Sequence, residues 1–226
     1  MSNLPFPSSV VGNLDLNHCA DISLPNGFAI TGSLYLIGCT ELTVLPDDLT
    51  VGESLYLVGC KGLTTLPKRL KVGGDLYLID CKNLTTVPGD LEVAGSLYLG
   101  GCTSLITLPD GLSVGGGLDL TGCKALKALP KQLKVGGFLR LNDCISLTAL
   151  PTGMSIGGSI QLSGCKGLIA PSPDLLKVGA YYALLRKVRI VERLVLTELR
   201  KFSVIDLIYL IVFGALMIPF IWSPAT

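Results

Sequence analysis

The sequence contains one histidine and few charged residues, and these shortages exclude most kinds of enzyme. His18 is the only histidine among 226 residues, and charged residues make up 15% of the chain, with a net charge of +1. A cysteine–histidine nucleophile would need His18 beside a thiol, but the adjacent Cys19 is expected to point to the opposite side of the chain. Asp and Glu are scattered over turns without a paired constellation. We therefore predict no catalytic residue and no small-molecule substrate.

Motifs for metals and cofactors are missing as well. The chain has no C-x-x-C pair for zinc and no G-x-x-x-x-G-K-S/T loop for phosphate. Glycine is abundant, with 27 residues, but it recurs as V-G-G at a fixed place in a repeat, which is typical of turns. We expect no metal, no cofactor and no nucleic acid partner.

Cysteine, in contrast, is present at regular intervals. The gap between successive cysteines is 20 and then 21 residues: Cys19, Cys39, Cys60, Cys81, Cys102, Cys123, Cys144 and Cys165. Around them one pattern recurs, L-x-L-x-x-C-x-x-L-x-x-L-P-x-x-L-x-V-G-G-x, as in residues 76–95. A fixed period of this length predicts a solenoid, whose units bury their apolar side only against neighbouring units.

This repeat resembles the leucine-rich repeat family over residues 4–180. The L-x-L-x-G-C-x-x-L-x-x-L-P form is similar to repeats of plant intracellular immune receptors, and the L-P-x-x-L-x-V form is similar to repeats of bacterial effector proteins. The resemblance implies an α/β-type solenoid of about eight repeats in residues 1–180, with a parallel β-ribbon on the concave side.

Each repeat is predicted to contribute one short strand, because L-x-L has the period-2 alternation of a half-buried strand. Leu55 and Leu57 would point inward and Tyr56 outward. The return path excludes a regular helix, since its proline removes a hydrogen-bond donor and its glycine pair permits backbone angles that other residues avoid. We expect the convex side to be extended or to form a short 3₁₀ turn.

The cysteines are predicted to face inward as small, reduced, buried side chains. Stacked repeats would bring neighbouring cysteine Cα atoms to about 5 Å, which a disulfide can bridge. However, eight equivalent residues in a column give no reason to choose particular pairs.

Residues that point out of the ribbon are free of packing constraints and are the candidates for binding. The middle position of L-x-L is tyrosine in four adjacent repeats and then becomes polar. The predicted partner-binding residues are Tyr35, Tyr56, Tyr77, Tyr98, Asp75, Asp119, Phe138, Arg140 and Gln161. Tyrosine is enriched at the energetic centres of protein interfaces. The alternative is that tyrosine only suits a pleated surface, where each cross-strand pair stabilises the sheet by about 0.2–1 kcal/mol.

Long apolar runs are confined to the C-terminus. Residues 203–226 contain an apolar segment that would form about 30 Å of helix, enough to cross a bilayer. The preceding residues, 181–202, predict an amphipathic basic helix with six Lys or Arg against two Glu, which would favour an anionic membrane surface. Together the two segments resemble a tail anchor, with residues 181–222 contacting lipid and the repeats facing the cytosol. The alternative is that the apolar helix caps the last repeat.

These patterns predict a non-enzymatic interaction module that binds a protein partner through the concave face and is held at a membrane by its C-terminus. No signal peptide is expected, because Leu4-Pro5 already matches the L-P of a repeat. The alternative is an effector-like repeat protein, cytoplasmic or secreted, whose C-terminal helix caps the solenoid or acts on host membranes.

Overall fold

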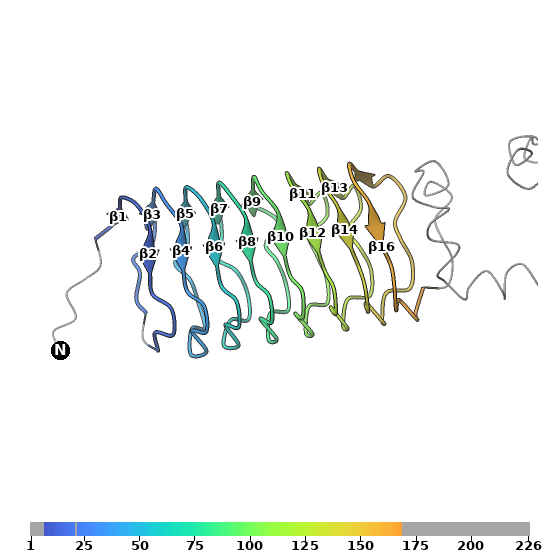
Figure 1. Ribbon diagram of the computed structural model, residues 1–226, viewed down its shortest axis with the longest axis horizontal. Coiled ribbons are helices and arrows are strands. Elements are labelled where there is room, and N and C mark those ends of the chain that lie inside the picture. The colour runs from blue at the N-terminus through green and yellow to red at the C-terminus, as the bar shows by residue number, and fades with distance from the viewer. Residues whose placement is uncertain (1–6, 21, 169–226) are drawn as a thin grey trace, which may run out of the picture. The chain divides into compact units, whose positions relative to one another are not determined.

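Each repeat forms two short strands, and the repeats stack into a solenoid (Figure 1). The computed structural model describes residues 7–20 and 22–168. The L-x-L segments form one eight-stranded sheet from β2 (Leu14–Asp15), β4 (Leu34–Tyr35), β6 (Leu55–Tyr56), β8 (Leu76–Tyr77), β10 (Leu97–Tyr98), β12 (Leu118–Asp119), β14 (Leu139–Arg140) and β16 (Ile160–Gln161). The two residues before each glycine pair form a second eight-stranded sheet. Its strands are β1 (Ser9–Val10), β3 (Ala29–Ile30), β5 (Thr50–Val51), β7 (Lys71–Val72), β9 (Glu92–Val93), β11 (Ser113–Val114), β13 (Lys134–Val135) and β15 (Ser155–Ile156).

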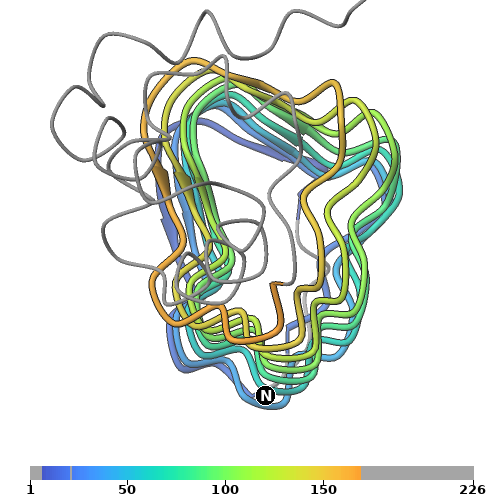
Figure 2. The same cartoon turned by 90° about the vertical axis from the view of Figure 1, so that its right-hand side faces the viewer.

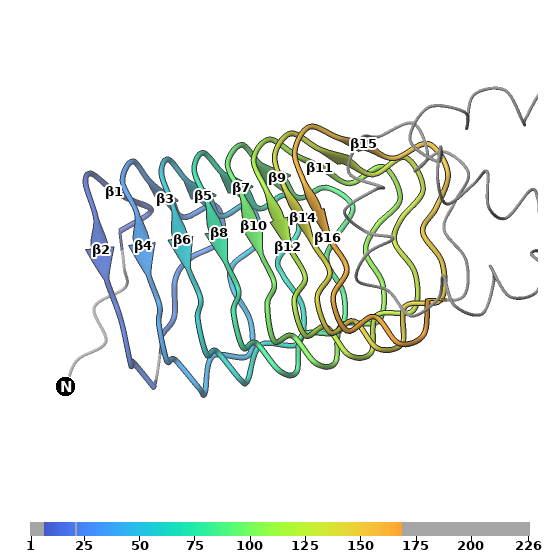
Figure 3. The same cartoon turned by 45° about the vertical axis from the view of Figure 1, so that its right-hand side comes forward.

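Both sheets are parallel, and neighbouring strands pair equivalent residues of successive repeats. Leu55 pairs with Leu76, for example, and Val51 with Val72. Figure 2, which looks along the stack, shows the outlines of the repeats closely superposed, and Figure 3 shows the two sheets on different sides of the stack. Translational symmetry of the sequence therefore becomes translational symmetry of the backbone.

From Thr64 to Thr148, a third side of the repeats is also tied to its neighbours by backbone hydrogen bonds. The amide of Thr85 donates to the carbonyl oxygen of Thr64 at 3.0 Å, and the amide of Ile106 donates to that of Thr85 at 3.1 Å. Ala128 and Ala149 form a parallel bridge on the same side. Part of the return path thus satisfies its backbone polar groups by pairing along the stack, without a helix.

The core consists of columns of identical side chains running along the stack. One column contains Leu34, Leu55, Leu76, Leu97, Leu118 and Leu139, and another contains Leu36, Leu57, Leu78, Leu99, Leu120 and Leu141. All these side chains are fully buried, and burial of each leucine contributes about 1.5–3 kcal/mol. The valines of the second sheet close the opposite side of the core, as at Val72 and Val114.

The glycine pair has a different role from the one predicted. Gly52 and Gly73 do not adopt positive φ; instead, a Cβ added at Gly73 would clash with the carbonyl oxygen of Gly52 in the preceding repeat. The two backbones approach each other closely at this corner, which favours glycine, although Thr31 and Ala94 occupy the same position in two of the repeats. Positive φ occurs at two other turns of the repeats: before the cysteine, as at Gly59 (φ 73°) and Asp80 (φ 58°), and after the proline, as at Asp48 (φ 61°) and Gly111 (φ 74°).

The predicted parallel ribbon and repeat solenoid are confirmed, but two details differ. Each repeat has two strands rather than one, because the segment before the glycine pair is extended and pairs along the stack as well. No helix occurs in residues 7–20 and 22–168, so the described part is a β-solenoid rather than an α/β solenoid. Within that part no helix is long and apolar enough to cross a membrane. The helices predicted for residues 181–202 and 203–226 lie outside the described residues.

Candidate functional site

The first sheet places four tyrosines in one column on its outward side. Tyr35, Tyr56, Tyr77 and Tyr98 occupy equivalent positions of β4, β6, β8 and β10, and each pairs in register with the next. We refer to these four residues as the tyrosine ladder, and to the outward side of the sheet β2–β16 as the ladder face. The leucines on either side of each tyrosine point into the core, so the alternation of L-x-L fixes this direction.

The four rings of the tyrosine ladder are stacked face to face. Their centroids are 4.7, 4.6 and 4.7 Å apart, and neighbouring ring planes differ by 6°, 5° and 3°. The separation equals the distance between neighbouring strands, which is about 4.8 Å, so the sheet sets the spacing of the rings. Each tyrosine is half-buried. Neighbours cover the ring faces, and the ladder therefore presents ring edges and hydroxyl groups to the outside.

Tyr77 differs from the other three because its hydroxyl has an internal partner. It donates a hydrogen bond of 3.0 Å to Oδ2 of Asp75. Burial, followed by this carboxylate, raises the pKa of Tyr77 to about 12. The hydroxyls of Tyr35, Tyr56 and Tyr98 have no hydrogen-bond partner among the described residues. Three donors along the ladder remain available to a ligand.

A second column of small polar residues lies beside the tyrosine ladder and ties each repeat to the next. In each case the side chain accepts a hydrogen bond from the amide one repeat later: Asn13 from Ser33 at 2.8 Å, Ser33 from Ser54 at 3.3 Å, Ser54 from Asp75 at 3.1 Å, Asp75 from Ser96 at 2.7 Å and Ser96 from Gly117 at 3.0 Å. Sequence reasoning placed Asp75 among the binding residues and missed this structural role. The signal was the small polar residue before each L-x-L from Asn13 to Ser96.

This polar column ends at Gly117, and an aromatic ring takes its place. The ring of Phe138 lies against Gly117, where an added Cβ would clash with it. From there it approaches Tyr98, with the centroids 6.4 Å apart and the planes tilted by 49°. The guanidinium of Arg140 lies 4.1 Å from the centroid of the Phe138 ring, a cation–π distance. The aromatic surface therefore continues past Tyr98 and ends in a positive charge.

The remaining predicted residues lie on the same face with separate partners. Oδ2 of Asp119 is 3.4 Å from Nη1 of Arg140, and both side chains are partly exposed, so the pair contributes little stability. Gln161 is exposed, and its Oε1 accepts a hydrogen bond from Asn142 at 3.1 Å. The structure thus brings all nine predicted residues onto one face.

The cysteine column lies on the inside of the solenoid. The thiol of Cys81 is fully buried and donates to the carbonyl oxygen of Leu57, in the preceding repeat, at 3.1 Å. The same contact recurs from Cys39 to Cys165, with Sγ–oxygen distances of 2.9–3.2 Å. Burial raises the pKa of Cys60, Cys102 and Cys144 to about 12. The predicted inward, apolar environment is confirmed, and Cys19, in the first repeat, is only half-buried.

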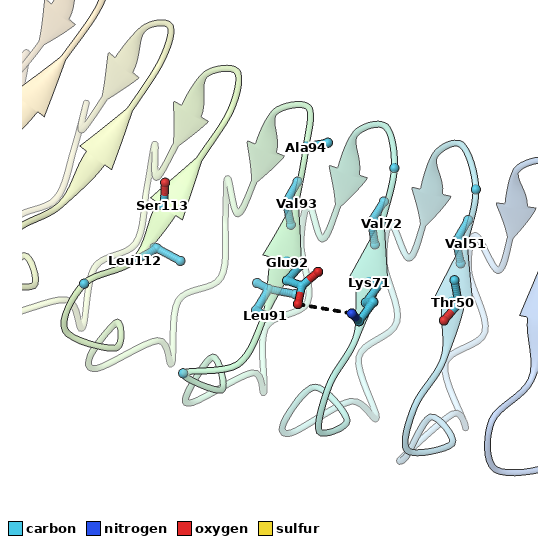
Figure 4. Close-up of a pocket in the computed structure, with 14 residues that line it drawn as sticks. Thr50, Val51, Lys71, Val72, Leu91, Glu92, Val93, Ala94, Leu112 and Ser113 are labelled. Atoms are coloured by element: carbon cyan, nitrogen blue, oxygen red, sulfur yellow. Dashed lines mark ion pairs between the residues drawn. The ribbon is translucent and has the colours of Figure 1, made fainter.

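A shallow depression of about 570 Å³ lies over the second sheet, where repeats come closest at their glycine corners (Figure 4). Lys71 Nζ and Glu92 Oε1 lie 3.3 Å apart across its floor, and both side chains are more than half exposed. Among residues 7–20 and 22–168, no group of three or more His, Cys, Asp or Glu is placed to hold a metal ion. The depression contains no convergent set of polar groups comparable to the ladder face.

Together these features define a parallel β-solenoid repeat protein with an aromatic outward column. Comparison with protein-family models, curated proteins and solved structures finds no match.

Proposed function

We propose that the chain is a non-enzymatic interaction module that binds a protein partner through the ladder face. The observation that carries this proposal is the row of aromatic rings from Tyr35 to Phe138, whose edges point outward. Three hydroxyls without an internal partner lie along it. Large half-buried aromatic residues with a polar tip are the side chains that dominate binding energy at protein interfaces.

The form of the tyrosine ladder favours a macromolecule over a small ligand. Within the ladder, both faces of Tyr56 and Tyr77 are covered by neighbouring rings, so a sugar or nucleobase cannot stack on these two rings. The exposed edges are distributed over several repeats rather than around one cavity. Ile37, Val58 and Ile79 border the tyrosines on the same face and add apolar area. An elongated surface of this kind suits a partner that contacts several repeats at once.

The finer assignment within this proposal is a short leucine-rich repeat module held at a membrane by residues 181–222. The repeat pattern supports the first part, and the uncharged run from Leu207 to Trp222 supports the second. Extraction of membranes with carbonate tests the anchor: the chain should remain in the pellet. Release into the soluble fraction would favour the alternative of an effector-like repeat protein in the cytoplasm or outside the cell.

Substitution within the tyrosine ladder tests the binding function. Tyr56→Ser combined with Tyr77→Ser removes two central rings, and partner binding is expected to weaken by about 2 kcal/mol or more, a factor of roughly 30. The measurement is affinity capture of partners from the source cells with the full chain, followed by calorimetric titration of each purified partner. A matched control is Thr64→Ser combined with Thr85→Ser on the third side, which should leave binding unchanged.

Thermal unfolding of the same variants separates binding from stability. Loss of all three stacked pairs is expected to lower the free energy of unfolding by about 1.5–4.5 kcal/mol. If binding of every captured partner is unaffected while the fold is destabilised, the tyrosine ladder serves only to hold the sheet together.

A further inference from the structure

The spacing of the tyrosine ladder restricts what can lie along it. Its rings repeat every 4.6–4.7 Å. In an extended peptide running along the stack, residues are about 3.3 Å apart, and side chains on one face are about 6.6 Å apart. These spacings differ from that of the rings, so the peptide side chains would no longer match the ring positions after two residues. Another solenoid of the same kind has the same spacing between repeats, so its side chains match the ring positions over its whole length.

We propose that the partner on the ladder face is a second copy of this chain, packed face to face and antiparallel along the stack. This proposal rests on the proposed function of the ladder face. A two-fold contact of this type is isologous, since the same residues contribute from both copies. Ring edges of one ladder then contact ring edges of the other.

The charges at the two ends of the column decide the orientation. The column that contains the tyrosine ladder reads Asp15, Tyr35, Tyr56, Tyr77, Tyr98, Asp119, Arg140 and Gln161. A parallel dimer would place Asp15, Asp119 and Arg140 each against its own copy, which opposes like charges three times. In the antiparallel dimer the first residues of one copy meet the last residues of the other.

One antiparallel register satisfies the charges and the free hydroxyls together. With the two Tyr77 residues at the centre, Asp15 faces Arg140 and Tyr35 faces Asp119 of the other copy. The first pair joins opposite charges, and the second gives the unpartnered Tyr35 hydroxyl a carboxylate acceptor. Each pair occurs twice by symmetry. The two Asp75 carboxylates also approach each other, but both oxygens of each already accept hydrogen bonds from Tyr77 and Ser96.

The size of the ladder face sets the strength of the dimer. Seven overlapping repeats spaced about 4.8 Å apart and three residues wide give roughly 350 Å² of sheet per copy. This is less than half of the roughly 800 Å² per partner in a standard interface, so we expect a weak dimer with a dissociation constant in the micromolar range.

Charge reversal tests the proposal in sedimentation velocity of the full chain in mild detergent, from about 10 to 300 µM. Arg140→Asp and Asp15→Arg should each raise the dissociation constant at least about tenfold, because each opposes like charges at both ends of the dimer. The double variant D15R/R140D should restore dimerisation, and so should an equimolar mixture of the two single variants. Restoration also rules out misfolding as the cause of the loss. Monomeric wild-type protein at 300 µM, or single variants that associate like the wild type, would overturn the proposal.

Photo-crosslinking distinguishes a second copy from any other partner and fixes the direction. Tyr35 is replaced by benzoylphenylalanine, and ¹⁴N-labelled and ¹⁵N-labelled chains are mixed before irradiation. We expect mixed-isotope adducts from position 35 to the segment 119–140. Adducts from position 35 to itself, or only to unrelated proteins, would contradict the antiparallel dimer. In the last case binding through the ladder face stands and only the identity of the partner is wrong.

Discussion

At the residue scale, the cysteine of each repeat shows how much a single position reveals before the fold is known. Its period and its place after L-x-L predicted a small inward side chain, and Cys60 and Cys81 are fully buried. The hydrogen bond from each thiol to a carbonyl oxygen in the preceding repeat could not be predicted, because its partner is 24 residues away. Only the stacking of repeats brings the two atoms together. Cysteine therefore combines apolar burial with a weak donor that bridges repeats.

The raised thiol pKa values predict that the fold loses stability in alkali. Cys60, Cys102 and Cys144 have pKa values of about 12 in the folded chain, whereas an unfolded cysteine ionises near pH 8.5. Above about pH 8.5 the unfolded chain releases these protons first, so the free energy of unfolding falls by about 1.4 kcal/mol per thiol per pH unit up to about pH 12. Urea unfolding between pH 8 and 11 measures the slope.

The control for this pH dependence is the triple variant with Cys60→Ser, Cys102→Ser and Cys144→Ser. Serine does not ionise in this range. The unfolding free energy of the triple variant should therefore fall with pH less steeply than that of the wild type, by about 4 kcal/mol per pH unit. Identical slopes in the two proteins would show that the thiols are not the titrating groups.

A pair of substitutions at Cys81 tests the thiol hydrogen bond. Asparagine carries a donor that can replace the thiol toward Leu57 O, whereas an ionised aspartate would place a charge against that oxygen without a partner. Cys81→Asp should therefore lower the free energy of unfolding by at least about 3 kcal/mol more than Cys81→Asn. Chemical denaturation at pH 7 decides between them. Equal losses would mean that this site is open to water.

At the scale of the element, the sequence predicted the L-x-L strands correctly but missed those of the second sheet. Alternation at Leu55, Tyr56 and Leu57 identified one buried face directly. The pair Thr50–Val51 is too short for periodicity to register, and it becomes a strand only because an equivalent pair lies beside it in each neighbouring repeat. Local pattern was therefore sufficient for the first sheet, and repeat stacking was required for the second.

Glycines at three positions of the repeat are expected to respond differently to substitution. Gly73→Ala should lower the free energy of unfolding by about 1–2 kcal/mol, because the new Cβ meets the backbone of Gly52 and the corner must shift to admit it, as it does at Ala94 in the next repeat. Gly59→Asn should cost about 1 kcal/mol or less, since open space surrounds it and asparagine tolerates its positive φ. Gly89→Ala is the control and should be nearly neutral, because its nearest neighbour is a Pro109 side-chain atom 3.8 Å away. Thermal unfolding ranks the three variants, and a larger loss for Gly59→Asn than for Gly73→Ala would contradict the close approach at the glycine corner.

At the scale of the whole molecule, stacking of one repeat places equivalent outward residues on the ladder face. The residues that differ between repeats determine the chemical character of that face. The sequence predicted that the tyrosines share a face, because equivalent residues of stacked strands lie side by side. It did not predict that Phe138 would reach back over Gly117 toward Tyr98, since this contact depends on a side chain missing from the neighbouring repeat. The aromatic surface and its charged end are thus a product of the assembled stack.

The most direct test of this account is a crystal structure of the chain, in which the positions of the four tyrosines can be compared. The account predicts Tyr35, Tyr56, Tyr77 and Tyr98 in one stack with ring centroids 4.6–4.7 Å apart, on a parallel sheet whose repeats each add a second strand. Tyrosines distributed over different faces, or a helix between successive L-x-L strands in residues 22–168, would contradict it.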